Sequence, residues 1–175
     1  MGAYPSELVR QWESEDGTLI TIRPIRPEDA AIEYDFVHQL SPRSKYLRFF
    51  SGLNELTPSM LTRFTHIDYQ REMALIATLM KENQEVEIAV GRFVPYLGGK
   101  SCEFALVVGD EWQRHGIGYQ IMQDLIKIGR ARQFKTMKGL ILSGNLEMLQ
   151  LVKDLGFKIT PVPGDAKVVE AVKEL

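Results

Sequence analysis

The apolar residues of the chain recur in two spacings, one typical of strands and one typical of helices. Runs with alternating or β-branched apolar residues predict strands at residues 18–23, 73–80, 86–94, 102–108, 137–142 and about 157–162. Apolar residues at helical spacing, together with N-cap and proline signals, predict helices at residues 28–39, 42–50, 59–64, 116–132 and 146–155. Residues 166–175 fit either a closing strand or a terminal helix.

The order of these elements indicates an α/β (α+β) fold. A strand hairpin comes first and crossover helices come later, which predicts a mixed sheet with helices on its faces. The chain has 175 residues, 45% of them hydrophobic, enough for one substantial core. We therefore expect a single domain over residues 17–175, preceded by a polar lead-in over residues 1–16. In the lead-in, Tyr4, Leu8 and Trp12 could pack on the domain by helical spacing.

The stretch from Cys102 to Arg132 joins a buried strand to a long helix through a turn with two glycines, Gly116 and Gly118. The first N–H groups of a helix have no partner inside it and lie at the positive end of the helix dipole. Glycines remove the Cβ atoms that would keep a phosphate away from this backbone. The turn lacks the third glycine of a dinucleotide fingerprint and the Lys-Ser or Lys-Thr of a P-loop. The pattern therefore predicts a phosphate site of another type.

The motif in this turn, Q/R-x-x-G-x-G between a strand and a helix, resembles the pyrophosphate loop of GNAT-family N-acetyltransferases. The second half of the chain is similar to that family in register, with a strand at 139–142, Asn145 and its helix, and Gly156-Phe157. A narrower resemblance, to the GNAT domain of bacterial Pat-type protein lysine acetyltransferases, is carried by T-I-R-P-I-R-P-E-D-A at 21–30, L-S-P at 40–42, R-F-F at 48–50, I-D-Y at 67–69, R-E-M-A at 71–74 and E-F-A at 103–105. Members of that group often carry the domain behind an acyl-CoA-synthetase-like region, so the chain could be a stand-alone relative or an excised domain.

The resemblance implies the GNAT fold, a mixed and mostly antiparallel sheet that splays between two parallel strands and is flanked by helices. It also implies acetyl-CoA as cosubstrate and protein lysine as acceptor, possibly on an acyl-CoA synthetase. The implied cofactor contacts come from the splayed strand, the loop and the following helix, at Leu106, Val107, Val108, Gln113, Arg114, His115, Gly116, Ile117, Gly118, Tyr119, Asn145 and Met148. For Asn145 the alternative is an Asx turn that only caps its helix.

Acetyl transfer to a lysine needs a base, because the ordinary pKa of the amine is about 10.4. Glu103 is our candidate, since Pat-type relatives use a glutamate at the matching place, and Glu72 is the alternative. The N–H of Val108 is our candidate donor to the thioester oxygen. Many GNAT enzymes have a tyrosine acid seven residues after the asparagine, whereas this chain has Val152. The group that protonates the leaving thiolate therefore stays open.

Composition narrows the possible partners. The net charge of −2 gives no electrostatic reason to expect nucleic acid or an anionic membrane as partner. The single cysteine, Cys102, excludes an intramolecular disulfide framework and a multi-cysteine metal site, and the three histidines suggest no metal. We expect Cys102 to be a buried core residue and the location to be the cytoplasm.

Two alternatives to protein lysine acetylation stay open. The missing tyrosine would also suit a module that senses acetyl-CoA and regulates a partner without efficient turnover. A small amine could be the acceptor, because acceptor specificity lies in the helices before residue 73, where the sequence signal is poor.

Overall fold

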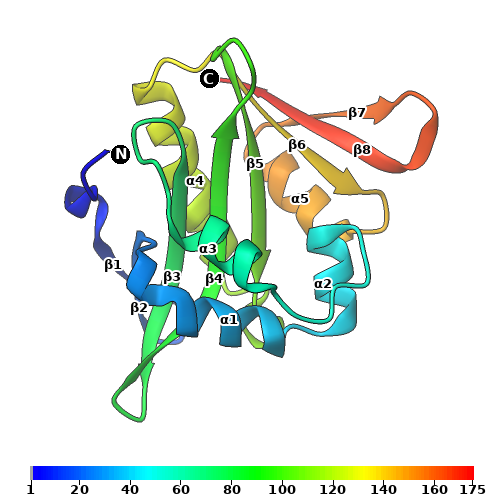
Figure 1. Cartoon of the computed structure of the whole chain (residues 1–175). Coiled ribbons are helices and arrows are strands. Elements are labelled where there is room, and N and C mark those ends of the chain that lie inside the picture. Colours follow the sequence, from blue (N-terminus) through cyan, green and yellow to red (C-terminus); the bar gives the residue numbers. More distant parts are fainter. Residues whose placement is uncertain (1) are drawn as a thin grey trace.

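A computed structural model of the chain describes residues 2–175 (Figure 1). The strands are β1 Arg10–Glu13, β2 Leu19–Pro24, β3 Met73–Lys81, β4 Gln84–Pro95, β5 Ser101–Val108, β6 Thr136–Leu142, β7 Lys158–Val162 and β8 Asp165–Glu174. The α-helices are α1 Ala30–Gln39, α2 Pro42–Phe49, α3 Pro58–Thr65, α4 Ile117–Ala131 and α5 Leu146–Asp154, and short 3-10 helices are η1 Ser6–Leu8, η2 Pro27–Asp29 and η3 Asp110–Trp112.

The strands form one eight-stranded sheet in the order β1-β2-β3-β4-β5-β6-β8-β7. Neighbouring strands are antiparallel except for β5 and β6, which are parallel and pair only from Ser101 to Glu103 of β5. Beyond Glu103 the two strands separate, which confirms the predicted mixed, mostly antiparallel sheet that splays between two parallel strands. Where pairing ends, the Phe104 ring lies on the backbone of Gly139, so that a Cβ there would stand 2.4 Å from Phe104 Cε1.

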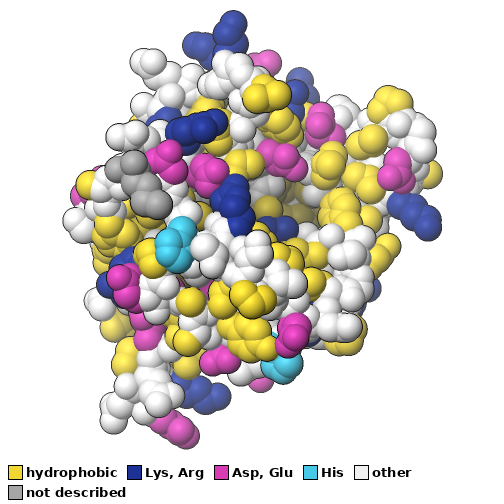
Figure 2. All heavy atoms as spheres, viewed as in Figure 1, with side chains coloured by type: hydrophobic (Ala, Val, Ile, Leu, Met, Phe, Trp, Pro, Cys, Tyr) yellow, Lys and Arg dark blue, Asp and Glu magenta, His cyan; other side chains and the backbone are white. Residues whose placement is uncertain are grey.

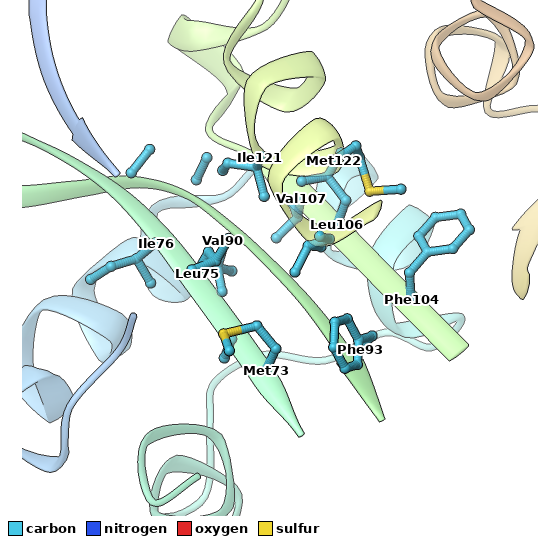
Figure 3. Packing of buried hydrophobic residues seen from close by; sticks show 14 of the residues in the cluster. Met73, Leu75, Ile76, Val90, Phe93, Phe104, Leu106, Val107, Ile121 and Met122 are labelled. Atoms are coloured by element: carbon cyan, nitrogen blue, oxygen red, sulfur yellow. The ribbon is translucent and has the colours of Figure 1, made fainter. Parts of the chain in front are cut away.

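Helices cover both faces of the sheet. In Figure 1, α1, α2 and α3 lie in front of it, and α4 and α5 lie behind. Figure 3 shows the core between the strands and α4, where Ile121 and Met122 of α4 lie over Leu106 of β5. The contact is so close that a Cβ on Gly91 would lie 2.5 Å from Ile121 Cγ2. This packing fixes α4, and with it the loop before α4, relative to β5.

The structure corrects one prediction for the start of the chain and resolves an open alternative at its end. Within the lead-in, Arg10–Glu13 is not helical but forms β1, antiparallel to β2. The four-residue strand is too short to be visible as a pattern, and it is stabilised by the free edge of β2. Tyr4, Leu8 and Trp12 do pack against the core, as expected. At the other end, residues 165–174 form the closing strand β8 rather than a helix.

The helices in front of the sheet begin as predicted. Ser41 accepts a hydrogen bond from the N–H of Ser44 at 3.1 Å and starts α2, and Thr57 accepts one from Met60 at 3.1 Å and starts α3. Each cap is followed by a proline at the first helical position, where no N–H donor is needed.

Buried charges join this helical layer to the sheet. Glu33 of α1 and Glu87 of β4 are 1% and 3% exposed, and Arg92 of β4 is 9% exposed. Arg92 donates to Glu33 at 3.4 Å and to the carbonyl of Phe64 in α3 at 3.2 Å. We call Glu33, Glu87 and Arg92 the buried charge cluster.

The surface mixes charges of both signs. On the face shown in Figure 2, acidic and basic side chains are interspersed with apolar ones. Over the described residues 2–175, none of the helices combines the length and apolar character needed to cross a membrane.

Candidate functional site

The loop between β5 and α4 has the backbone geometry that an anion site requires. Gly116 has a φ of +84° and Arg114 a φ of +66°, so the chain turns sharply before α4. The N–H groups of Ile117, Gly118 and Tyr119 donate to no acceptor in the described part of the chain, whereas Gln120 N–H donates to the Gly116 carbonyl at 3.1 Å. Three free donors at the positive end of a 15-residue helix suit a phosphate group.

A pocket of about 610 Å³ opens at this loop. Its walls come from β5, the loop and the start of α4, α2, and α5. It is lined by Arg43, Ser44, Leu47, Arg48, Leu106, Val107, Val108, Asp110, Trp112, Gln113, Arg114, Gly116, Ile117, Gly118, Tyr119, Asn145, Leu146, Glu147, Met148, Gln150, Leu151 and Asp154. The structure thus brings together all the predicted cofactor residues except one. His115 is exposed and stands beside Trp112, with a ring-centroid distance of 6.0 Å.

The edge of β5 that faces this pocket carries unpaired backbone groups. Gly109 N–H donates to the carbonyl of Ile88 on β4 at 2.8 Å. Alternate residues of a strand turn their N–H and C=O groups to opposite edges, so Leu106 and Val108 turn theirs away from β4. Because pairing with β6 ends at Glu103, these N–H groups face the gap between the two strands.

The α5 wall is held by its own cap. Asn145 Oδ1 accepts a hydrogen bond from Met148 N–H at 3.2 Å, so the Asx capping that we considered for this residue is present. Asn145 also lines the pocket, which leaves its amide nitrogen free for a ligand. Across the pocket mouth, Arg114 forms an ion pair with Glu147 at 3.1 Å.

The α2 wall was not predicted from the sequence. Asp110 accepts hydrogen bonds from the Ser41 hydroxyl at 2.8 Å and the Ser44 hydroxyl at 2.6 Å, and Gln113 donates to the carbonyl of Val108 at 3.1 Å. Burial would raise the pKa of Asp110, but these hydrogen bonds hold it below its ordinary value. The ionised Asp110 thus fixes the start of α2 against the end of β5. The available signal was the cap Ser41-Pro42, which predicts the helix but not the element it contacts.

Glu103 lies where β5 and β6 separate. It is half-buried, opposite Val94 of β4 and in register with Lys138 of β6. It does not line the large pocket. Burial, together with the carboxylates of Glu103 and Glu170, raises the pKa of the neighbouring Tyr96 to about 12. Glu103 therefore stands at the inner end of the open β5 edge, beside a tyrosine hydroxyl.

The other residues that the sequence suggested for catalysis lie away from the pocket and from Glu103. Glu72 forms a bidentate ion pair with Arg63, in which each Nη of the guanidinium donates to one carboxylate oxygen at 3.1 Å. Cys102 is 0% exposed, and burial raises the pKa of its thiol to about 12, as expected for a core residue. Val152 is also 0% exposed, so its position faces the core and not the pocket. Among residues 2–175, no three His, Cys, Asp or Glu side chains are grouped as metal ligands.

Comparisons with known proteins agree with this geometry. The family model described as acetyltransferase (GNAT) domain matches residues 20–158. The chain is 31% identical over 152 residues to the protein named Acetyltransferase PA5475 of Pseudomonas aeruginosa, a match that covers 87% of this chain and 82% of that one.

Among solved structures, the GNAT domain of S. lividans PAT superposes with a TM-score of 0.88 and 26% identity, covering 99% of this chain and 100% of that one. A cAMP-binding acyltransferase from Mycobacterium smegmatis superposes with a TM-score of 0.64 and 21% identity, which shows the fold alone; the match covers 95% of this chain and 46% of that one. We conclude that the chain belongs to the GNAT family and is an acetyltransferase.

Proposed function

We propose that this enzyme transfers the acetyl group of acetyl-CoA to lysine ε-amines of proteins, with Glu103 as general base. The observation that carries the proposal is the open edge of β5, which joins a phosphate-type loop at one end to a half-buried glutamate at the other. The likeness to the GNAT domain of S. lividans PAT supports a protein acceptor. Metabolic enzymes such as acyl-CoA synthetases are the expected targets, and the cytoplasm is the expected location.

The residues present fit acetyl-CoA, the acyl donor that GNAT enzymes use in general. The free N–H groups of Ile117, Gly118 and Tyr119 would hold the diphosphate. The Val108 N–H would bond an amide of the pantetheine arm, as an added strand bonds a sheet edge. Acetyl-CoA supplies the activated acyl group, and the protein supplies position and charge.

Distances along β5 suggest which backbone N–H donates a hydrogen bond to the thioester oxygen. A strand rises about 3.3 Å per residue, so Val108 lies roughly 16 Å along β5 from Glu103, whereas Leu106 lies roughly 10 Å away. A base that acts through one water must be near the carbon under attack. We therefore assign the Leu106 N–H to the thioester oxygen, a role that the sequence led us to predict for Val108.

The acceptor amine would reach Glu103 from the side opposite the cofactor loop. A smaller pocket of about 340 Å³ lies there, lined by Tyr96, Leu97, Gly98, Lys100, Ser101, Lys138 and Glu170. The carboxylate of Glu170 would attract a lysine ammonium, and Glu103, through water, would take its proton as the N–C bond forms.

Gly118 offers a test of the cofactor site. A Cβ at this position would lie 3.2 Å from Leu106 Cδ2 and 3.4 Å from Leu151 Cδ2 and Val108 Cγ2. The branched side chain in Gly118→Val would fill the pocket beside the free N–H groups. We expect acetyl-CoA binding, measured by calorimetry, to weaken by roughly 5- to 150-fold, since forcing an extra side chain into a filled site costs roughly 1–3 kcal/mol. Gly144→Val, at a glycine with no atom within 4 Å of its Cβ position, is the matched control.

The proposed acceptor is tested by incubating the enzyme with acetyl-CoA and a purified acyl-CoA synthetase, followed by mass spectrometry of its lysines. We expect acetylation at one or a few lysines, in greater yield than without enzyme. A control reaction contains Gly118→Val at the same concentration. If small amines are acetylated and no protein is, the acceptor class is wrong although the acetyltransferase chemistry stands.

A further inference from the structure

Arg48 lines the large pocket without a partner of its own. Its side chain is half-buried, and among residues 2–175 its guanidinium makes no hydrogen bond or ion pair, the nearest carboxylate influences being those of Glu33 and Glu103. A partly desolvated cation that no carboxylate contacts directly is unfavourable, so such an arrangement suits a site where an anion is present for part of the reaction.

The position of this guanidinium is fixed by α2. Arg48 is one turn after Ser44, which is bonded to Asp110 at the end of β5. The guanidinium carbon stands 4.9 Å from the centre of the Phe49 ring, and Phe49 stacks on Phe64 of α3 with a centroid distance of 6.3 Å. These contacts hold the cation in a wall of the pocket that is also lined by Val107 of β5.

Arg48 also lies within the electrostatic reach of Glu103. Burial and the charge of Arg92 lower the pKa of Arg48 to about 10, while the carboxylates of Glu33 and Glu103 oppose that shift. Arg48 is therefore protonated at neutral pH, in the wall of the pocket.

We propose that the guanidinium of Arg48 stabilises the thiolate that leaves during acetyl transfer, in the role that a tyrosine has in many relatives. The inference rests on the proposed function. The amine nitrogen forms a bond to the acyl carbon, the C–S bond breaks, and its electron pair stays on sulfur beside Arg48. The amine proton goes to Glu103, and the thiolate takes a proton from solvent after release. Val152 stands on α5 at the position of that tyrosine, but it is buried in the core and has no group that could protonate or stabilise a thiolate.

The test measures how pH affects the binding of coenzyme A and of S-methyl-coenzyme A, which has no ionisable thiol. We use calorimetry from about pH 6 to about pH 9, a range that brackets the ordinary thiol pKa of about 8.5. We expect coenzyme A, but not its S-methyl analogue, to bind the parent roughly eightfold more tightly at about pH 9 than at about pH 6, the effect of lowering the thiol pKa by one unit. In Arg48→Met this gain should vanish, and in Arg48→Lys part of it should remain.

Transfer kinetics give a second readout. Arg48→Met should lower kcat by at least about tenfold, equivalent to one unit in the thiol pKa, with little change in KM for acetyl-CoA. Arg130→Met, at an exposed arginine in the last turn of α4, controls for the change in net charge.

Three results would overturn the inference. Equal pH dependence in the parent and Arg48→Met would show that Arg48 does not contact the sulfur. Equal weakening of both ligands in Arg48→Met, at every pH, would make Arg48 a phosphate contact instead. If the parent binds neither ligand, the proposed function itself fails, and this inference fails with it.

Discussion

Replacing Glu103 with glutamine is expected to lower kcat by roughly 10²–10⁴-fold, the usual contribution of a general base. The amide keeps the size of the side chain but cannot take the proton of an ammonium whose ordinary pKa is about 10.4. Acetyl-CoA binding should not change, because Glu103 does not line the cofactor pocket. The measurement is coenzyme A release with a lysine-bearing protein, alongside calorimetry with acetyl-CoA.

Glu72→Gln is the matched control for this experiment. Glu72 was the alternative base in the sequence, but its carboxylate is occupied by Arg63 in the structure. We expect Glu72→Gln to retain the parent rate. Loss of activity in Glu72→Gln, with Glu103→Gln unaffected, would contradict the assignment. If the parent binds acetyl-CoA and acetylates no acceptor, the sensing module becomes the better interpretation.

Replacing Arg92 with methionine is expected to lower the free energy of unfolding by about 3–5 kcal/mol, since it removes the cation of a buried ion pair. Arg92 is the arginine bonded to Glu33 in the buried charge cluster, and the two carboxylate oxygens of Glu87 accept no hydrogen bond in the described chain. Methionine replaces the aliphatic stem of arginine and brings no polar group of its own, but it gives up the contact of the guanidinium carbon with the Phe64 ring, 4.6 Å from its centre. Urea unfolding followed by circular dichroism measures the change.

The free energy of unfolding that Arg92→Met loses should increase as pH rises. Burial, and then the charge of Glu33, raise the pKa of Glu87 well above its ordinary value of 4.5. A carboxyl group with a raised pKa contributes stability that is fully present below pH 4.5 and is lost as pH rises through the folded-state pKa. Without Arg92 the shift increases, so Arg92→Met should lose more stability at neutral pH than at pH near 4.5.

Two further variants separate this electrostatic effect from loss of packing. Adding Glu87→Gln to Arg92→Met should recover part of the stability at neutral pH, because one buried carboxyl group can then no longer ionise. Arg63→Met, which removes an arginine from an ion pair that is 54% exposed on the arginine side, should change the free energy of unfolding by at most about 1 kcal/mol. An equal loss in Arg92→Met at every pH would contradict the electrostatic explanation.

The sequence by itself determined the local features of this protein. The turn at Gly116 needs a φ of +84°, which glycine adopts without strain, and the helix that follows leaves its first donors free whatever surrounds it. The caps at Ser41 and Thr57 are also local, as are most strands, whose alternation reflects one buried face. For this reason the elements and the phosphate-type loop were predictable from short stretches of residues.

Tertiary structure decided which distant side chains meet. Ser44 and Asp110 are 66 residues apart, and no periodicity in either segment indicates that α2 forms a wall of the pocket. The alternation of β5 places Glu103 and Phe104 on opposite faces, but only the separation of β5 from β6 creates the open edge between Glu103 and the loop. The packing also decided the environment of Arg48. Its sequence position does not show that the guanidinium lines the pocket and has no carboxylate of the described chain in direct contact.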